Sequence, residues 1–201
     1  DIYGKGVCEE LFGKVIKNDS TLKREDIIIQ SKCGIRENFY DQSKDYIISS
    51  VDNILKRLQT DYIDILLLHR PDALVEPEEV SEAFYNLKNC GKVRYFGVSN
   101  HKPMQIELLK KYLKQDLVVN QLQFSLLSSN MVSNGLEVNM QTNGGIDRDN
   151  SVLDYCRFND ITIQAWSPFQ APNWNGPFIE NKLYKNLNDT SSNSKYNVIE
   201  S

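Results

Sequence analysis

Five short apolar runs, each followed at once by polar side chains, constrain the fold of this chain more than any other feature. The clearest lies in the segment Asp61–Asp72, where the run Ile63–Leu68 is broken only by Asp64 and ends at His69. The other runs end at Ser31-Lys32, Ser99-Asn100, Asn120-Gln121 and Trp166-Ser167. Such runs are typical of strands buried on both faces of a parallel sheet. Because the carboxyl ends of parallel strands meet at one edge, we expect these polar side chains to share one site.

Amphipathic segments alternate with these runs and predict helices between the strands. One apolar stripe runs from Val7 to Ile16, and a longer one covers residues 43–59, with its charges on the opposite face. Further helices are expected from Pro77 to just before Gly91, from Pro103 to Leu113, and around Val152 to Cys156. The first strand is expected at Asp26–Gln30 and the last at Ile161–Ala165. The Ser-, Asn- and Gly-rich segment 128–150 is predicted to be a loop that covers the site.

A strand and a helix recur with a unit of roughly thirty residues, which requires right-handed parallel crossovers. An open doubly wound sheet and a (β/α)8 barrel both fit this alternation. A dinucleotide-binding doubly wound sheet should carry a GxGxxG turn after its first strand, and the sequence has none. Polar ends on successive strands favour the barrel, which needs about 250 residues when complete. We therefore expect residues 1–201 to form a single partial barrel domain of α/β class, roughly strands 3–7 with flanking helices, incomplete at both ends.

Charge and cysteine usage exclude several classes of function. The net charge of −4 has no basic concentration suited to nucleic acid. Four widely separated cysteines and only two histidines indicate neither a metal site nor a disulfide framework. No stretch approaches the ~20 apolar residues of a membrane span. The sequence therefore predicts a cytoplasmic protein without nucleic-acid or membrane partners, and it leaves the oligomeric state open.

Six short motifs in one order resemble those of the aldo-keto reductases, and most closely the bacterial oxidoreductases of that family. They are Tyr3 in DIYG, Lys32 in SKCG, His69 in LLLHRPD, Ser99-Asn100 in FGVSN, Gln121 in VNQ and Trp166-Ser167 in AWSP. The match extends along nearly the whole chain. This resemblance implies a (β/α)8 barrel (TIM barrel) that reduces the carbonyl group of a small aldehyde or ketone with NADPH.

The resemblance also implies a role for each catalytic residue. Tyr3 is expected to give a proton to the carbonyl oxygen as hydride arrives from the nicotinamide. A phenol has an ordinary pKa of about 10 and becomes an effective acid-base group only beside a cation, for which Lys32 is the matching residue. His69 is expected to orient and polarise the carbonyl through a hydrogen bond.

For the cofactor, the resemblance assigns Ser99, Asn100 and Gln121 to the carboxamide and Trp166 to stacking on the nicotinamide ring. Ser167 and Phe169 fall where the family contacts the pyrophosphate. The segment in which the family carries basic residues for the 2′-phosphate is not in this chain, so NADH remains an alternative to NADPH.

Two departures and two rival functions accompany this interpretation. The family's catalytic carboxylate lies five residues before the tyrosine, which precedes Asp1, and Asp1 itself does not match that position. We expect an open barrel of these 201 residues to be poorly stable and to have little activity. One rival is a non-catalytic nicotinamide-binding module that senses redox state, and the other is a lyase or isomerase of sugar phosphates.

Several residues also have plain structural interpretations. Taken alone, Tyr3 and Trp166 could be packing aromatics and Lys32 a solvated lysine at a strand end. His101 is expected to be an exposed loop residue and the four cysteines inert packing residues. The substrate pocket is expected to use segments 128–150 and 170–181, with Trp174 and Phe178 as walls.

Overall fold

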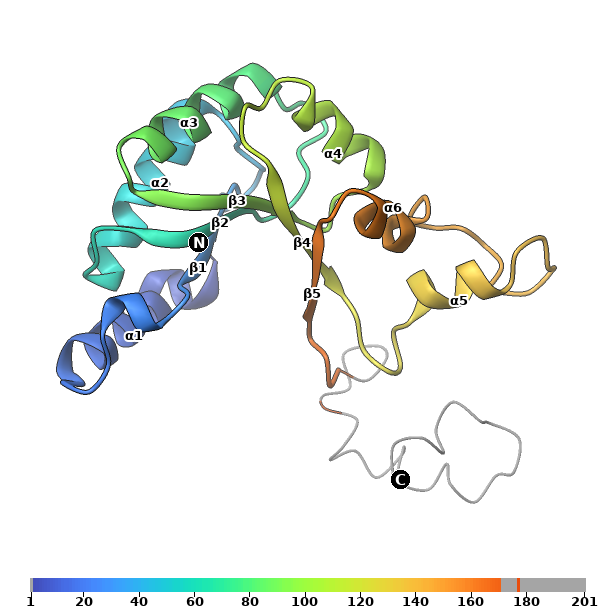
Figure 1. The fold of residues 1–201 in the computed structure, drawn as a ribbon, viewed down its shortest axis with the longest axis horizontal. Coiled ribbons are helices and arrows are strands. Elements are labelled where there is room, and N and C mark those ends of the chain that lie inside the picture. Colours follow the sequence, from blue (N-terminus) through green and yellow to red (C-terminus); the bar gives the residue numbers. More distant parts are fainter. Residues whose placement is uncertain (1, 171–176, 178–201) are drawn as a thin grey trace.

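The computed structural model describes residues 2–170 and 177, and its central feature is one parallel sheet with the strand order β1-β2-β3-β4-β5 (Figure 1). The strands are β1 (Gln30–Cys33), β2 (Ile63–Leu68), β3 (Val93–Ser99), β4 (Leu117–Gln123) and β5 (Thr162–Trp166). Each strand pairs in parallel with the next strand along the chain. The predicted parallel sheet with five successive strands is therefore confirmed.

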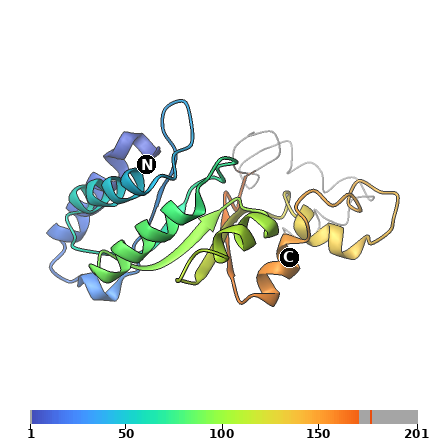
Figure 2. The ribbon, with the colours of Figure 1, turned by 90° about the horizontal axis from the view of Figure 1, so that it is seen from above.

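Helices connect the strands and follow one face of the sheet. They are α1 (Val7–Asn18), α2 (Lys44–Leu58), α3 (Pro77–Asn89), α4 (Pro103–Lys110), α5 (Asn130–Leu136) and α6 (Val152–Phe158), with short 3-10 turns η1 (Tyr3–Gly6) and η2 (Arg24–Asp26). Helices α2 and α3 lie side by side in both views (Figures 1 and 2). Among the described residues, no helix is both long and apolar enough to cross a membrane.

The core forms where the apolar stripes of the helices meet the buried face of the sheet. On α2, Ile47, Val51 and Ile54 are buried, as their spacing of three and four residues predicts. Phe84 of α3 stacks on Phe96 of β3 with ring centroids 4.1 Å apart. All of these residues belong to one continuous hydrophobic cluster, which fixes the strands and hence the edge where they end.

Asp64, the one break in the apolar run of β2, is held by a cluster of arginines at the opposite end of the sheet from His69. Its carboxylate accepts hydrogen bonds from Arg24 at 2.7 Å, from the Ile29 amide at 2.9 Å and from Arg94 at 3.0 Å. Burial alone would raise the pKa of Asp64, but these hydrogen bonds and the two positive charges outweigh it and hold the pKa below its ordinary value. The Asp64 carboxylate therefore has three hydrogen-bond partners, and its two arginines connect β2 to η2 and to β3.

Two predicted element boundaries are wrong. The first strand is Gln30–Cys33, not Asp26–Gln30, because Asp26 belongs to η2 and the pairing with β2 starts at Gln30. The segment 128–150 is not wholly a loop, because α5 forms within it and buries Met131 against the core.

Two predicted environments are wrong as well. His101 is only 3% exposed. Its ring Nδ1 lies 2.9 Å from the Ser99 carbonyl oxygen, and the His101 backbone carbonyl accepts a hydrogen bond from Asn120 Nδ2. Cys33 and Cys156 are buried as expected, but Cys8 and Cys90 are exposed. The proposed pocket walls Trp174 and Phe178, and most of segment 170–181, lie outside the described residues.

Candidate active site

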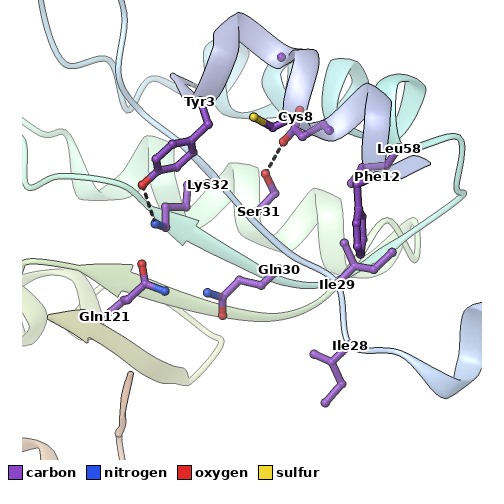
Figure 3. Close-up of a pocket in the computed structure, with 12 residues that line it drawn as sticks. Tyr3, Cys8, Phe12, Ile28, Ile29, Gln30, Ser31, Lys32, Leu58 and Gln121 are labelled. Carbon is purple, nitrogen blue, oxygen red and sulfur yellow. Dashed lines mark hydrogen bonds between the residues drawn. The ribbon is translucent and has the colours of Figure 1, made fainter. Parts of the chain in front are cut away.

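Tyr3 begins the 3-10 turn η1, which precedes α1 and lies beside β1 (Figure 3). Its hydroxyl accepts a hydrogen bond from Lys32 Nζ at 3.2 Å and lies 3.5 Å from His69 Nε2. The rings of Tyr3 and His69 are stacked, with their centroids 5.6 Å apart. The three residues predicted to be catalytic are therefore brought together, although Tyr3 is 54% exposed.

The register of the sheet explains why Lys32 and His69 meet. Lys32 pairs with Leu67 across β1 and β2, and the His69 amide donates to the Cys33 carbonyl at 2.8 Å. Because parallel strands place their carboxyl ends at one edge, Lys32 near the end of β1 and His69 directly after β2 converge there. The sequence prediction of a shared edge is confirmed for these two residues.

His69 is a neutral hydrogen-bonding group over the whole physiological range. Burial lowers its pKa from the ordinary 6.5 to about 3, and the positive charges of Lys32 and Arg70 act in the same direction. An imidazole of this kind has one N–H donor and one acceptor nitrogen. It can orient an oxygen atom but is not charged near neutral pH.

Glu9, in the first turn of α1, anchors the segment that bears Tyr3. Its carboxylate accepts a hydrogen bond from Ser31 Oγ at 2.5 Å and from Arg57 Nε at 2.6 Å. Arg57 also packs over Gly6, where an added Cβ would come within 2.7 Å of the arginine Cδ. The start of α1 is thereby joined to β1, next to Lys32, and to α2. Nothing in the sequence distinguishes Glu9 as a site residue, because acidic residues are common in the first turn of a helix, where they interact favourably with its dipole.

A chain of hydrogen bonds links four of the residues predicted to bind the cofactor, the last of them through its backbone. Trp166 Nε1 donates to Asn100 Oδ1 at 2.9 Å, and Asn100 Nδ2 donates to Ser99 Oγ at 2.8 Å. Ser99 Oγ in turn donates to the backbone carbonyl of Gln121 at 3.0 Å. Asn100 adopts a left-handed backbone with φ of 61°, which lets its amide turn back over the ends of β3 and β4.

The side chain of Gln121 points not to these cofactor residues but toward the predicted catalytic residues Tyr3 and Lys32 (Figure 3). These three residues are among those that line a cavity of about 620 Å³ beside α1 and β1 (Figure 3). Gln121 Nε2 donates to Gln164 Oε1 at 3.1 Å, whereas Gln121 Oε1 is buried and has no partner among the described residues. Gln164 was not among the predicted site residues, although a glutamine within an apolar strand is a usable signal.

Ser167 and Phe169 lie in the turn that follows β5. Ser167 has φ of 52°, and its carbonyl accepts a hydrogen bond from the Gln170 amide at 3.0 Å. The Phe169 side chain is 57% exposed. Their assignment to the pyrophosphate stays a prediction.

The sequence matches the Aldo/keto reductase family over residues 1–199. Oxidoreductase YcsN of Bacillus subtilis is 42% identical over 178 residues, which cover 84% of this chain and 54% of that protein. A 6-dehydroglucose reductase of Agrobacterium fabrum is 34% identical over 178 residues, with the same coverage of 84% and 54%. An aldo/keto reductase from Klebsiella pneumoniae, solved in complex with NADP and acetate, gives a TM-score of 0.64 at 25% identity over 93% of this chain and 58% of that chain. The chain thus spans about half the length of the curated relatives that it matches.

These similarities also settle the architecture. The structural relatives are aldo-keto reductases, and the five parallel strands with their outer helices match part of their (β/α)8 barrel. The predicted fold class is therefore confirmed.

Proposed function

Because the chain belongs to the aldo-keto reductase family, we propose that the protein reduces aldehyde or ketone carbonyls to alcohols with a nicotinamide dinucleotide. The observation that carries the proposal is the position of the Tyr3 hydroxyl, 3.2 Å from Lys32 Nζ and 3.5 Å from His69 Nε2. A phenol between a cation and a neutral imidazole is a suitable proton donor to a carbonyl oxygen. The substrate is proposed to be a small molecule.

Each of the three residues has a separate task in this proposal. Tyr3 gives its hydroxyl proton to the carbonyl oxygen, which becomes the alcohol. Lys32 stabilises the phenolate left on Tyr3, since its ammonium group already donates to that oxygen. His69 stays neutral because burial depresses its pKa to about 3, so it orients the carbonyl by a hydrogen bond and transfers no proton.

The residues on the cofactor side fit a nicotinamide carboxamide, which has one acceptor oxygen and two N–H donors. Asn100 Nδ2 donates one of its two hydrogens to Ser99 Oγ and keeps the other for a ligand. Gln121 Oε1 is a buried acceptor with no hydrogen-bond partner among the described residues. One donor and one acceptor are thus available. When bound, the reduced nicotinamide supplies the hydride that adds to the carbonyl carbon. We propose that Trp166 stacks on its ring, and that Ser99, whose hydroxyl is already engaged, acts by holding Asn100.

Three further assignments belong to this proposal. NADPH is the preferred cofactor, with support from the relative solved with NADP, and Ser167 and Phe169 contact its pyrophosphate. Residues 1–201 form one partial barrel domain, with support from the single hydrophobic cluster of the described residues. The protein is cytoplasmic, for which its free cysteines give support.

Replacing Tyr3 tests the proposed function. In the full-length protein, Tyr3→Phe should lower the rate of carbonyl reduction by about 10²–10⁴-fold, the usual contribution of a general acid. The Kd of NADPH should not change, because the Tyr3 hydroxyl forms its hydrogen bonds with Lys32 and His69, which belong to the proposed catalytic residues. Tyr85→Phe, on the exposed face of α3, is the matched control. Undiminished reduction by Tyr3→Phe would refute the proposal.

A further inference from the structure

Three glutamine side chains form a hydrogen-bonded layer next to Tyr3 and Lys32. Gln30 comes from β1, Gln121 from β4 and Gln164 from β5. Gln164 Oε1 accepts one hydrogen bond from Gln30 Nε2 at 2.9 Å and a second from Gln121 Nε2 at 3.1 Å. Strands β1 and β5 are the two outer strands of the sheet, so Gln164 joins its edges across the interior of the partial barrel.

The bond from Gln164 determines how the Gln121 amide is turned. An amide presents an acceptor oxygen on one side and a donor nitrogen on the other. With Nε2 engaged by Gln164, Oε1 faces the side of Lys32 and Tyr3, as Figure 3 shows. If the Gln121 amide rotated by half a turn, Gln121 Oε1 would face Gln164 Oε1, and two acceptor oxygens would repel each other. Gln164 therefore selects one of the two orientations.

The Gln121 oxygen that this orientation presents accepts no hydrogen bond from residues 2–170 or 177. It is buried and has no hydrogen-bond partner among the described residues, which is uncommon for a buried polar atom. A buried acceptor is stabilised when a ligand supplies the missing donor. The Gln121 side chain lines the same cavity as Tyr3 and Lys32, so such a ligand group would sit beside the proton donor.

We propose that Gln164 is a positioning residue, which orients Gln121 so that Gln121 Oε1 accepts a hydrogen bond from the carboxamide N–H2 of the nicotinamide. This inference rests on the proposed function. It adds to that function a residue that does not touch the cofactor. Gln164 acts only through the amide orientation of Gln121, and Asn100 supplies the donor for the carboxamide oxygen.

A pair of cofactors that differ at one group tests the proposal. NADP+ carries the carboxamide N–H2, whereas its 3-acetylpyridine analogue carries a methyl group there. Titration calorimetry on the full-length protein should show NADP+ binding about tenfold more tightly, the usual effect of leaving a buried acceptor unpaired. Gln164→Met, which removes the acceptor at similar volume, should abolish this preference by weakening NADP+ alone. Gln164→Glu, which keeps an acceptor oxygen, should retain the preference.

Gln30→Met is the matched control, because it removes the other hydrogen bond to Gln164 Oε1 and leaves the bond to Gln121 in place. It should keep the preference for NADP+. The inference is overturned if Gln164→Met discriminates like the wild type, if Gln30→Met loses the preference equally, or if the wild type binds both compounds alike. In each of these cases the proposed function stands. Only a wild type that binds neither dinucleotide contradicts the proposed function itself.

Discussion

The candidate site has a cofactor side, formed by Asn100, Gln121 and Trp166, and a proton-donor side, formed around Tyr3. The three cofactor residues lie directly after β3, on β4 and on β5, respectively, whereas Tyr3 lies on a four-residue turn outside the sheet. On the cofactor side, hydrogen bonds between neighbouring strand ends fix each side chain, and Ser99 pairs with Gln121 in the sheet itself. On the proton-donor side, Tyr3 is held by Lys32, by His69 and indirectly by Glu9. The sheet therefore positions every side chain of the cofactor side, whereas on the proton-donor side it positions Lys32 and His69 but not Tyr3, which is held by contacts between separate elements.

This difference predicts that a substitution that loosens the sheet itself damages both sides together, and the largest effect is expected at Asp64 of β2. Asp64→Ala leaves Arg24 and Arg94 without their shared carboxylate. Breaking a buried ion pair from one side costs about 3–5 kcal/mol, and the free energy of unfolding should fall by an amount near the lower end, because Arg24 is largely buried whereas Arg94 is half exposed. Asp52→Ala, which removes an exposed pair with Lys92, should cost at most about 1 kcal/mol in the same denaturant titration. Equal costs would show that the Asp64 cluster does not hold the sheet.

A substitution in the anchor of α1 should separate the two sides. Glu9→Ala removes the bonds to Ser31 and Arg57, so the turn that bears Tyr3 loses its fixed position. A displacement of a catalytic group by about 1 Å can lower the rate by about 10²-fold. We therefore expect kcat to fall by up to about 10²-fold and the Kd of NADPH to stay constant. Glu10→Ala, at the exposed neighbouring position, serves as the control, and Glu9→Gln should recover part of the loss. A change in cofactor affinity with constant kcat would contradict the separation.

Each side also contains one buried histidine, and acid should reveal both. Burial lowers the pKa of His69 to about 3 and that of His101 to about 4, from the ordinary 6.5. Below pH 6.5 the unfolded chain is protonated at these residues and the folded chain is not. The free energy of unfolding should therefore fall as the pH drops, by up to about 1.4 kcal/mol per pH unit for each histidine.

Comparison of two variants identifies the histidine responsible. The contribution should end near pH 4 for His101 and near pH 3 for His69, and it should be absent above pH 6.5. His69→Asn and His101→Asn should each remove one such slope in denaturant titrations between pH 4 and 6.5. Unchanged slopes in both variants would contradict the neutral, buried state of these rings.

The sequence was sufficient to predict what depends on local periodicity. Apolar runs and helical stripes determined the parallel sheet and its polar edge, and thus brought Lys32 and His69 together. The loop around His101 was misjudged, because its burial depends on a bond to Ser99 and on Asn120, which lies on a different strand.

Local periodicity could not predict residues whose partners lie on distant elements of the fold. Gln30 and Gln164 are 134 residues apart, and only the curvature of the sheet makes them neighbours. Glu9 looks like any acidic residue near a helix start, and its partners on β1 and α2 are set by packing of α1. Periodicity identifies the face on which a side chain lies, but it does not identify the partner that the side chain meets there.

The proton-donor side is tested most directly at Lys32, whose ammonium group donates a hydrogen bond to the Tyr3 hydroxyl (Figure 3). We would measure single-turnover carbonyl reduction and the Kd of NADPH for Lys32→Met in the full-length protein. We expect the rate to fall by about 10²–10⁴-fold, because the phenol loses its cation, and the Kd to stay unchanged. A rate near that of the wild type, or a loss confined to cofactor binding, would contradict the assignment of Tyr3, Lys32 and His69 as the catalytic group.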